Sequence, residues 1–257
     1  MDAADFVDKY QSLSIMADVP NAPFTCTVAC NKYLIATQGN IADIRARQAK
    51  VIAAIKKSGA TFDSGAAVRL SNGKASPGDM EDLLSSAVEA NALPQDPLAL
   101  QRWADANLGV DCTGFVVAFL VEIGVRDWNA TLNGGLSCPY IYTNIAKLNW
   151  NLTRYADQPE IWDVDDMQAN DIIIWAKSGG APETKHPGHI SIIVKTDHSG
   201  ITCAESNDSD DNHDGVTGPK TTTRQLGMIQ KGGGKRWWQH STGVIVVRPP
   251  AGSGASP

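Results

Sequence analysis

The stretch LGVDCTGFVVAFLVEIG, residues 108–124, decides the expected fold of this chain. Every residue from 115 to 121 is apolar, and Gly124 closes the run. This pattern predicts a short helix that is buried on most of its sides, with Cys112 where the first turn begins. Unpartnered backbone N–H groups and the helix dipole favour a reactive thiolate at that position. A structural cysteine on a core helix is the alternative.

A histidine and a carboxylate follow on two adjacent predicted strands. His189 lies at the entry to the apolar stretch HPGHISIIVKT, residues 186–196, and Glu205 lies in GITCAESND, residues 200–208. A turn between the two stretches would make the strands antiparallel, which brings Glu205 beside His189. A nucleophilic cysteine needs a base, and the base needs a group that orients it. The sequence therefore offers Cys112, His189 and Glu205 for these three roles.

Short motifs around these residues resemble a known superfamily. DCTGFV at 111–116 resembles the nucleophile motif of the NlpC-like papain-fold cysteine peptidases. PGHISIIV at 187–194, followed by AESN at 204–207, resembles the CHAP branch, the cysteine, histidine-dependent amidohydrolases/peptidases. ANDIIIW at 169–175 is similar to the strand that precedes the histidine in both branches. The resemblance spans approximately residues 105–250.

This resemblance implies an α+β fold with a papain-like core, in which the cysteine helix packs on an antiparallel sheet. It implies a catalytic set of Cys112, His189, Glu205 and Asn207, since CHAP enzymes use Cys, His, Glu and an Asn two residues after the Glu. It also implies an amidohydrolase or endopeptidase that needs no cofactor. The implied substrate is the peptide part of bacterial peptidoglycan.

The surroundings of the nucleophile supply candidate substrate-binding residues. Thr113 stands where NlpC-like enzymes usually have Ser. Many of these enzymes place an aromatic residue with glycines shortly before the nucleophile, and in this chain only Trp103 or Asn107 could serve in its place. Asp111 could bind a free amino group of the substrate, as the matching residue does in some NlpC-like enzymes. The alternative for Asp111 is a helix N-cap.

The rest of the chain follows a helix-then-strand order. Helical periodicity covers residues 41–59, 80–90 and 98–108, and residues 61–77 are expected to form a loop because they are rich in Gly, Ser and Asn. Strand patterns cover residues 172–175, 190–194, 201–204 and 244–247. We therefore expect a helical N-terminal region at 1–98, the hydrolase domain at 99–250 and a flexible tail at 251–257.

Composition narrows the function classes. The chain has 257 residues and a net charge of −6, which argues against nucleic acid as the main partner. Five cysteines exclude a complete disulfide framework. The N-terminus MDAADFVDKY has no signal-peptide pattern, and no apolar run is long enough to cross a membrane. We expect synthesis in the cytoplasm, with any export through a system that reads no N-terminal signal.

Three weaker patterns have plain alternatives. Residues 210–215 (DDNHDG) match the opening of a calcium loop without its closing ligand, so a solvated acidic loop is favoured. Cys26 and Cys30 are too few for zinc, and two core thiols or a pair on one helical face is favoured. KGGGKRWWQH at 231–240 would suit the rim of a glycan-peptide site, but a loop that enters the last strand is favoured.

An antibacterial effector or a lysin, with an immunity or inhibitor protein as a partner, would fit this set of features. Two rivals stay open. A thiol acyltransferase or lipid hydrolase on the same fold would use the same cysteine and histidine. A non-catalytic binding module would keep the fold without the chemistry.

Overall fold

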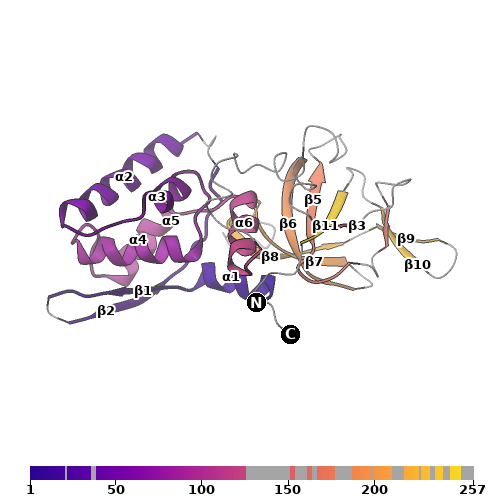
Figure 1. Cartoon of the computed structure of the whole chain (residues 1–257), viewed down its shortest axis with the longest axis horizontal. Coiled ribbons are helices and arrows are strands. Elements are labelled where there is room, and N and C mark those ends of the chain that lie inside the picture. Colours follow the sequence, from indigo (N-terminus) through magenta and orange to yellow (C-terminus); the bar gives the residue numbers. More distant parts are fainter. Residues whose placement is uncertain are drawn as a thin grey trace. The chain divides into compact units, whose positions relative to one another are not determined.

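The computed structural model shows an α+β fold (Figure 1). It describes residues 1–20, 22–35, 39–125, 151–153, 161–163, 167–176, 187–197, 200–209, 217–225, 227–231, 235–239 and 244–249. The chain forms two compact units: Met1–Phe6, Val116–Glu205 and Thr221–Pro257 make unit 1, and Val7–Phe115 with Ser206–Lys220 make unit 2. Neither unit follows the expected division between residues 98 and 99.

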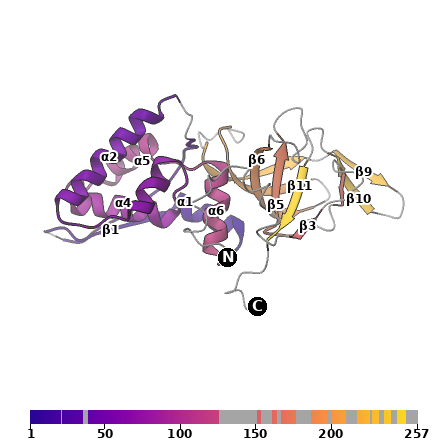
Figure 2. The ribbon, with the colours of Figure 1, turned by 45° about the horizontal axis from the view of Figure 1, so that its top comes forward.

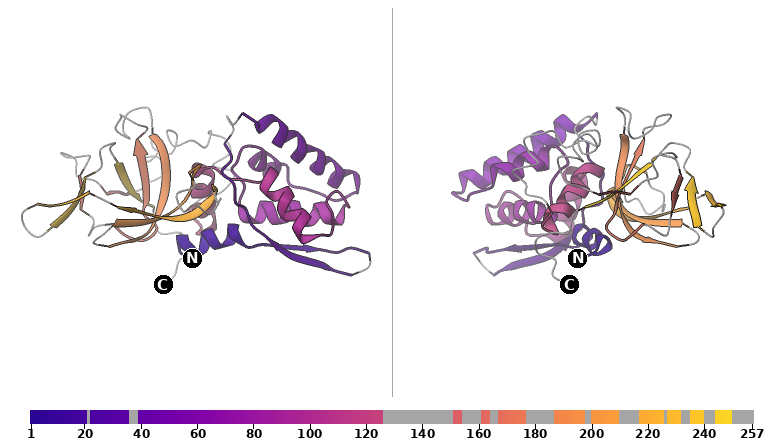
Figure 3. Two further views of the ribbon diagram at one scale, coloured as in Figure 1. Left: turned by 180° about the vertical axis from the view of Figure 1, so that it is seen from behind. Right: turned by 45° about the vertical axis from the view of Figure 1, so that its right-hand side comes forward.

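Unit 2 combines helices with a β-hairpin. Its helices are α2 (Ile41–Lys57), α3 (Ser64–Ser71), α4 (Pro77–Glu89) and α5 (Pro97–Asn107), and α1 (Ala3–Gln11) leads into the unit from unit 1. The hairpin consists of β1 (Leu13–Ala17) and β2 (Phe24–Val28), which pair antiparallel. Figure 1 and the left view of Figure 3 show α4 lying along this hairpin. The expected helical region is therefore interrupted by strands that helical periodicity did not predict.

The hairpin forms because its first strand alternates between buried and exposed side chains. Leu13, Ile15 and Ala17 are buried, whereas Ser14 and Met16 between them are exposed. This two-residue period buries one face of the strand against α4 and leaves the other in water. The sequence LSIMA shows this alternation only in part, because Ser14 is polar but the exposed Met16 is apolar, so the pattern alone did not predict the strand.

Three predicted helices are confirmed with small changes at their ends. Helix α2 stops two residues before Gly59, whose φ of +88° is the expected left-handed conformation. Helix α5 matches its prediction to within one residue. Helix α4 begins earlier than predicted, because Ser76 and Asp79 form a capping box around Pro77 at the first helical position.

Helix α3 contradicts the predicted loop at residues 61–77. Its N-cap Asp63 accepts hydrogen bonds from the backbone N–H groups of Gly65 and Ala66. Its Arg69 is buried and forms an ion pair with Asp79 of α4. The Gly- and Ser-rich composition therefore misled the prediction, since a cap and a tertiary ion pair outweigh low helix propensity.

The apolar run around the cysteine forms α6 (Cys112–Glu122), as predicted. It ends before Gly124, which has a φ of +74°. Residues 115–120 are all 2% exposed or less. Within unit 2, Phe115 packs on Tyr10 with ring centroids 5.7 Å apart, and within unit 1, Phe119 packs on Phe6 at 5.6 Å. The helix is buried from Cys112 to Leu120, as its composition indicated, whereas Val121 is half-buried and Glu122 is exposed.

A six-stranded sheet carries the histidine. The strand order is β3-β11-β5-β6-β7-β8, and Figure 2 shows β11, β5 and β6 side by side. The strands are β3 (Asn151–Thr153), β5 (Ile172–Ala176), β6 (Pro187–Thr196), β7 (Gly200–Ser206), β8 (Pro219–Gln225) and β11 (Val244–Arg248). All four predicted strands are present, as β5, β6, β7 and β11, and each extends beyond its predicted bounds.

A separate three-stranded sheet has the order β4-β10-β9, with β4 at Ile161–Asp163, β9 at Gly227–Lys231 and β10 at Lys235–Gln239. The tryptophan pair Trp237 and Trp238 lies on β10, in the middle of this sheet. The prediction of a loop at these two residues is therefore wrong. The strands were missed because the segment mixes charged residues, glycines and aromatic residues rather than alternating them.

Candidate active site

Cys112 is the first residue of α6 and is 6% exposed. The preceding residue, Asp111, caps the helix: its Oδ1 accepts a hydrogen bond of 2.7 Å from the N–H of Gly114, and its carbonyl accepts one of 2.9 Å from Phe115. The N-cap alternative for Asp111 is therefore confirmed. Because the Asp111 side chain satisfies the backbone N–H of Gly114, it fixes the first turn of α6, which carries the Cys112 thiol.

Two glycines let another backbone segment approach this first turn. Gly73 has a φ of +67°, and its carbonyl accepts a 2.9 Å hydrogen bond from the N–H of Asp111. A Cβ on Gly114 would overlap the Gly73 carbonyl and lie 2.8 Å from the Cα of Lys74. A Cβ on Gly73 would in turn overlap the carbonyl of Leu34. Only glycine fits at either position.

Lys74 follows in the same segment and forms an ion pair with Oδ2 of Asp111. The two side chains are 13% and 11% exposed. Burial raises the pKa of Asp111 to about 6, the charge of Lys74 lowers it, and the neighbouring Cys112 raises it. The amino group that Asp111 contacts in this structure is thus that of Lys74. The binding of a substrate amino group by Asp111 stays a prediction.

Tyr33 is a neighbour of the thiol that the sequence did not reveal. Its hydroxyl donates to the Sγ of Cys112 at 3.9 Å, and Thr113 Oγ1 lies 3.8 Å from the same sulfur. Burial, followed by the charges of Cys112 and Asp111, raises the pKa of Tyr33 far above its usual value, so the hydroxyl keeps its proton. Tyr33 reaches this position because it pairs with Val110 in a parallel β-bridge. Its sequence, CNKYLIA, carries no motif that could have found it.

His189 and Glu205 lie together in unit 1, as the sequence predicted. Strands β6 and β7 are antiparallel, with Ile192 opposite Ala204 and Ile193 opposite Cys203. His189 Nε2 and Glu205 Oε2 are 2.7 Å apart. The imidazole is 22% exposed, whereas the carboxylate is completely buried. A buried carboxylate requires such a partner, so the pair fixes the orientation of the ring.

Trp175 packs beside the histidine from the neighbouring strand β5, where it is paired with His189 in register. The two ring centroids are 5.6 Å apart, and the ring planes are inclined by 32°. Trp175 is 7% exposed. The indole therefore shields one side of the imidazole.

The other candidate residues lie in unit 2. Asn207 Oδ1 accepts hydrogen bonds from the backbone N–H and the hydroxyl of Ser209. These two bonds span two residues and form a local side-chain turn. Trp103 lies on α5, where its carbonyl accepts a hydrogen bond of 2.7 Å from the Asn107 side chain. The amide oxygen of Asn107 accepts from Arg47 of α2. The contacts of Asn107 thus anchor helices, and the substrate-binding role of Trp103 stays a prediction.

Two sequence patterns are candidates for metal binding, the pair Cys26 and Cys30 and the acidic stretch 210–215. Cys26 lies on β2 and Cys30 follows that strand, so the alternative of a pair on one helical face is wrong. Burial raises the pKa of the Cys30 thiol to about 12, as befits a core residue. The described part of the chain contains no group of three or more His, Cys, Asp or Glu side chains that could hold a metal ion. The acidic stretch 210–215 lies outside the described residues.

Comparison of the chain with family models, with curated proteins and with solved structures finds no match. The likeness to the NlpC-like and CHAP enzymes therefore rests on the short sequence motifs alone. Among the described helices, none has the length and apolar composition that a membrane crossing requires.

Proposed function

We propose that this protein is a cysteine amidohydrolase or endopeptidase with a papain-like core, acting on the peptide part of bacterial peptidoglycan. Cys112 is the nucleophile, His189 the base, and Glu205 the group that orients the base. The observation that carries the proposal is the 2.7 Å contact between His189 Nε2 and the fully buried Glu205. The substrate class follows from the family resemblance alone.

The His189–Glu205 pair suits a base for a thiol. A carboxylate that accepts from Nε2–H sets the tautomer, so that Nδ1 is the basic nitrogen of the ring. The same carboxylate stabilises the imidazolium that forms once the proton has been taken. The imidazole is partly exposed, as a group that meets substrate must be, while its partner is fully buried.

The environment of Cys112 suits a nucleophile. The thiol lies at the start of an α-helix of 11 residues, where the dipole stabilises negative charge. The Tyr33 hydroxyl donates to the sulfur. A purely structural thiol in an apolar core would need neither feature.

The reaction proceeds in two steps. His189 takes the thiol proton, the thiolate attacks the amide carbonyl, and the C–N bond breaks as His189 returns the proton to the leaving amine. Water then attacks the thioester, with His189 as base, which releases the carboxylic acid and restores the thiol. The backbone N–H of Cys112 would donate to the oxyanion in both steps, and Asn207 or a residue near 103–107 would supply a second donor.

Digestion of purified peptidoglycan tests the activity. Wild type should release fragments with new amine and carboxyl ends, detected by mass spectrometry, whereas Cys112→Ala should release none. Cys203→Ser, at another buried thiol, is the matched control and should remain active. Release of fragments by Cys112→Ala would overturn the proposed mechanism. Acyl transfer to an added amine, or ester cleavage without peptide cleavage, would indicate the acyltransferase or lipid hydrolase alternative.

Alkylation by iodoacetamide tests whether Cys112 and His189 act together. The pH profile of alkylation at Cys112 should shift when His189 is changed to Ala, and it should shift less in Glu205→Gln, which keeps a hydrogen-bonding side chain. Slow labelling at Cys112, equal to that at Cys30 and unchanged in both variants, would favour a non-catalytic binding module.

A further inference from the structure

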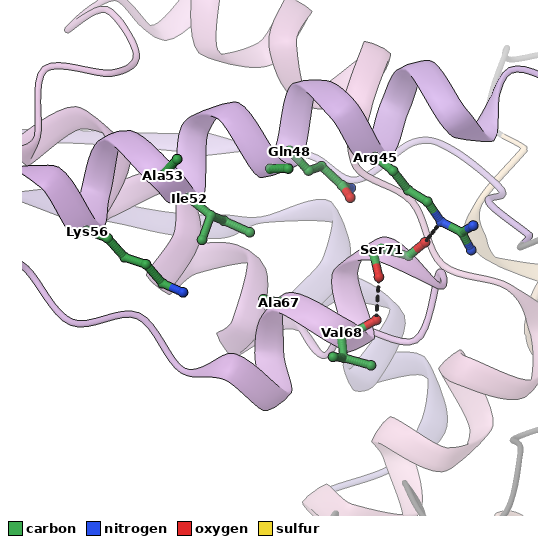
Figure 4. A pocket seen from close by; sticks show the side chains of 9 residues that line it. Arg45, Gln48, Ile52, Ala53, Lys56, Ala67, Val68 and Ser71 are labelled. Carbon is green, nitrogen blue, oxygen red and sulfur yellow. Dashed lines mark hydrogen bonds between the residues drawn. The ribbon is translucent and has the colours of Figure 1, made fainter.

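A groove lies between α2 and α3 in unit 2 (Figure 4). Its volume is about 370 Å³, within the range of about 300–1,000 Å³ that ligand-binding pockets have. Its floor is apolar and is formed by Ile52 and Ala53 of α2 with Ala67 and Val68 of α3. Val68 is 51% exposed. A large aliphatic side chain in a concave surface is a typical feature of a binding groove.

Two cationic side chains also line the groove, Arg45 near the start of α2 and Lys56 near its end. Arg45 donates to the Ser71 carbonyl at 2.7 Å and to the Asn72 side chain at 2.8 Å, and both of these acceptors are neutral. Within the described residues, neither cation forms an ion pair with a carboxylate. The groove therefore combines an apolar floor with uncompensated positive charge.

The whole of α2 has the opposite charge from the rest of the chain. It carries five basic residues and one acidic residue, in a protein whose net charge is −6. Such a patch attracts an acidic surface and slows the approach of a basic one. The charge of the helix thus indicates the sign of the occupant.

Gln48 adds a polar feature to the wall of the groove. It is 2% exposed, and its Nε2 donates to the Asn107 carbonyl at 2.7 Å. Its Oε1 accepts no hydrogen bond within the described residues. A buried acceptor without a donor is costly, so rotation of this side chain toward a donor on the occupant would gain free energy.

We propose that this α2–α3 groove docks an acidic amphipathic helix of a partner protein. Apolar side chains of that helix cover the floor, and carboxylates near its two ends meet Arg45 and Lys56. These two residues are eleven positions apart on α2, which is about 16 Å at 1.5 Å per residue. This spacing matches about three turns of a helix and exceeds the reach of a small carboxylate ligand. A groove between two helices fits the apolar face of a third helix.

Selection of 15-residue peptides from a displayed library on the full-length protein supplies the probe. The recovered peptides, labelled with a fluorophore, are then titrated with wild type by fluorescence anisotropy. We expect peptides with apolar residues at helical spacing and acidic residues toward both ends. Recovery of basic peptides, or of none that bind, would overturn the proposal.

Variants then locate the binding site. Val68→Glu should weaken binding of the recovered peptide more than tenfold, because it places a charge on the floor. Arg45→Gln and Lys56→Gln should each weaken it about two- to fivefold, as expected for exposed ion pairs. Lys50→Gln is the matched control, since it removes the same charge from α2 outside the groove lining, and it should stay within twofold.

Two results would overturn the groove as the site. The first is equal affinity of wild type and Val68→Glu, with a circular dichroism spectrum showing that the variant is folded. The second is binding to phosphatidylglycerol vesicles that is lost in Val68→Glu and Lys56→Gln, which would assign this surface to a membrane. Cys112→Ala should bind the recovered peptides like wild type, so this test is independent of the proposed catalytic function.

Discussion

Tyr33 and Lys74 are the residues that most change the interpretation of the cysteine helix. Tyr33 places a hydroxyl donor 3.9 Å from the thiol, and Lys74 neutralises the aspartate that caps the helix. Besides Asp111 and Thr113, the nucleophile candidate therefore has Tyr33 as a polar neighbour from 79 residues earlier in the chain. Lys74, from a second segment, is paired with the capping aspartate. This environment is consistent with a thiolate that is stabilised by donors and not by the helix alone.

Removal of the Tyr33 hydroxyl tests its contribution to the thiolate. Tyr33→Phe should lower the rate of Cys112 alkylation at pH 7, and any hydrolysis, by about ten- to a hundredfold, since a hydrogen bond to a charged group contributes about 1.5–3 kcal/mol. Rates are measured with iodoacetamide and mass spectrometry. The melting temperature of the variant serves as the control for folding. An unchanged alkylation rate in a folded variant would show that the tyrosine only packs against the sulfur.

Asp111 should make stability depend on pH. Its pKa is raised from 3.8 to about 6 in the folded chain, mainly by burial. The folded state therefore binds this proton more tightly than the unfolded state does, and the free energy of unfolding that Asp111 contributes falls as the pH rises from about 4 to about 6.

Asp111→Asn keeps a good N-cap but cannot titrate. The free energy of unfolding of wild type minus that of Asp111→Asn should therefore decrease between pH 4 and pH 6 and then level off. Urea unfolding at pH 4, 5, 6 and 7 measures this difference. A difference that rises with pH would mean that Lys74 outweighs burial and lowers the pKa of Asp111.

At the scale of elements, the first turn of α6 is held by its neighbours as much as by its own sequence. The aspartate cap fixes the N–H of Gly114, and the Gly73 carbonyl holds the N–H of Asp111. The close approach of these two segments depends on the missing side chains of two glycines. Any change that widens the contact should move the thiol as well.

Gly114→Ala should therefore reduce both stability and activity. The new Cβ would overlap backbone atoms of Gly73 and Lys74, which cannot rotate away, so we expect a loss of more than about 1 kcal/mol in the free energy of unfolding. Gly78→Ala is the matched control. It lies in α4, where the nearest atom to a new Cβ is Ser76 Oγ at 3.9 Å, and it should be neutral or slightly stabilising. Equal unfolding curves for the two variants, measured in urea, would contradict this account.

The whole molecule is divided in a way that the linear sequence does not suggest. Each compact unit is built from separate segments of the chain, and both α6 and β7 belong in part to each unit. The thiol, its cap and Tyr33 lie in unit 2, whereas His189 and Glu205 lie in unit 1. A hydrolase domain that begins at residue 99 would lack most of unit 2.

A fragment that starts at residue 99 should not fold cooperatively. It would lose Tyr10, which packs on Phe115, and the segment of Lys32 and Tyr33 that hydrogen-bonds and pairs with Val110. We expect poor dispersion in its ¹H–¹⁵N spectrum and no sigmoidal urea transition, in contrast to the full chain. A well-dispersed spectrum of the fragment would restore the division at residues 98 and 99.

Local patterns were sufficient for part of the fold and of the candidate site. The cysteine helix, four strands and three helices could be predicted because their periodicity and turn residues lie within each segment. The contact of His189 with Glu205 could be predicted because only three residues separate β6 from β7 in the chain, so that antiparallel strand pairing alone brings them together. The hairpin β1–β2 and α3 were missed, since a five-residue alternation and a cap are weaker signals than the surrounding composition.

By itself, the sequence determined the α+β class, the position of Cys112 at a helix start and the pairing of His189 with Glu205. Only the tertiary structure decided that Tyr33, Gly73 and Lys74 surround the start of α6, and that α2 and α3 leave a groove between them. The physical reason is distance along the chain. Local hydrogen bonding and side-chain period fix an element, but contacts between distant segments depend on which faces pack together, and no pattern within either segment records that choice.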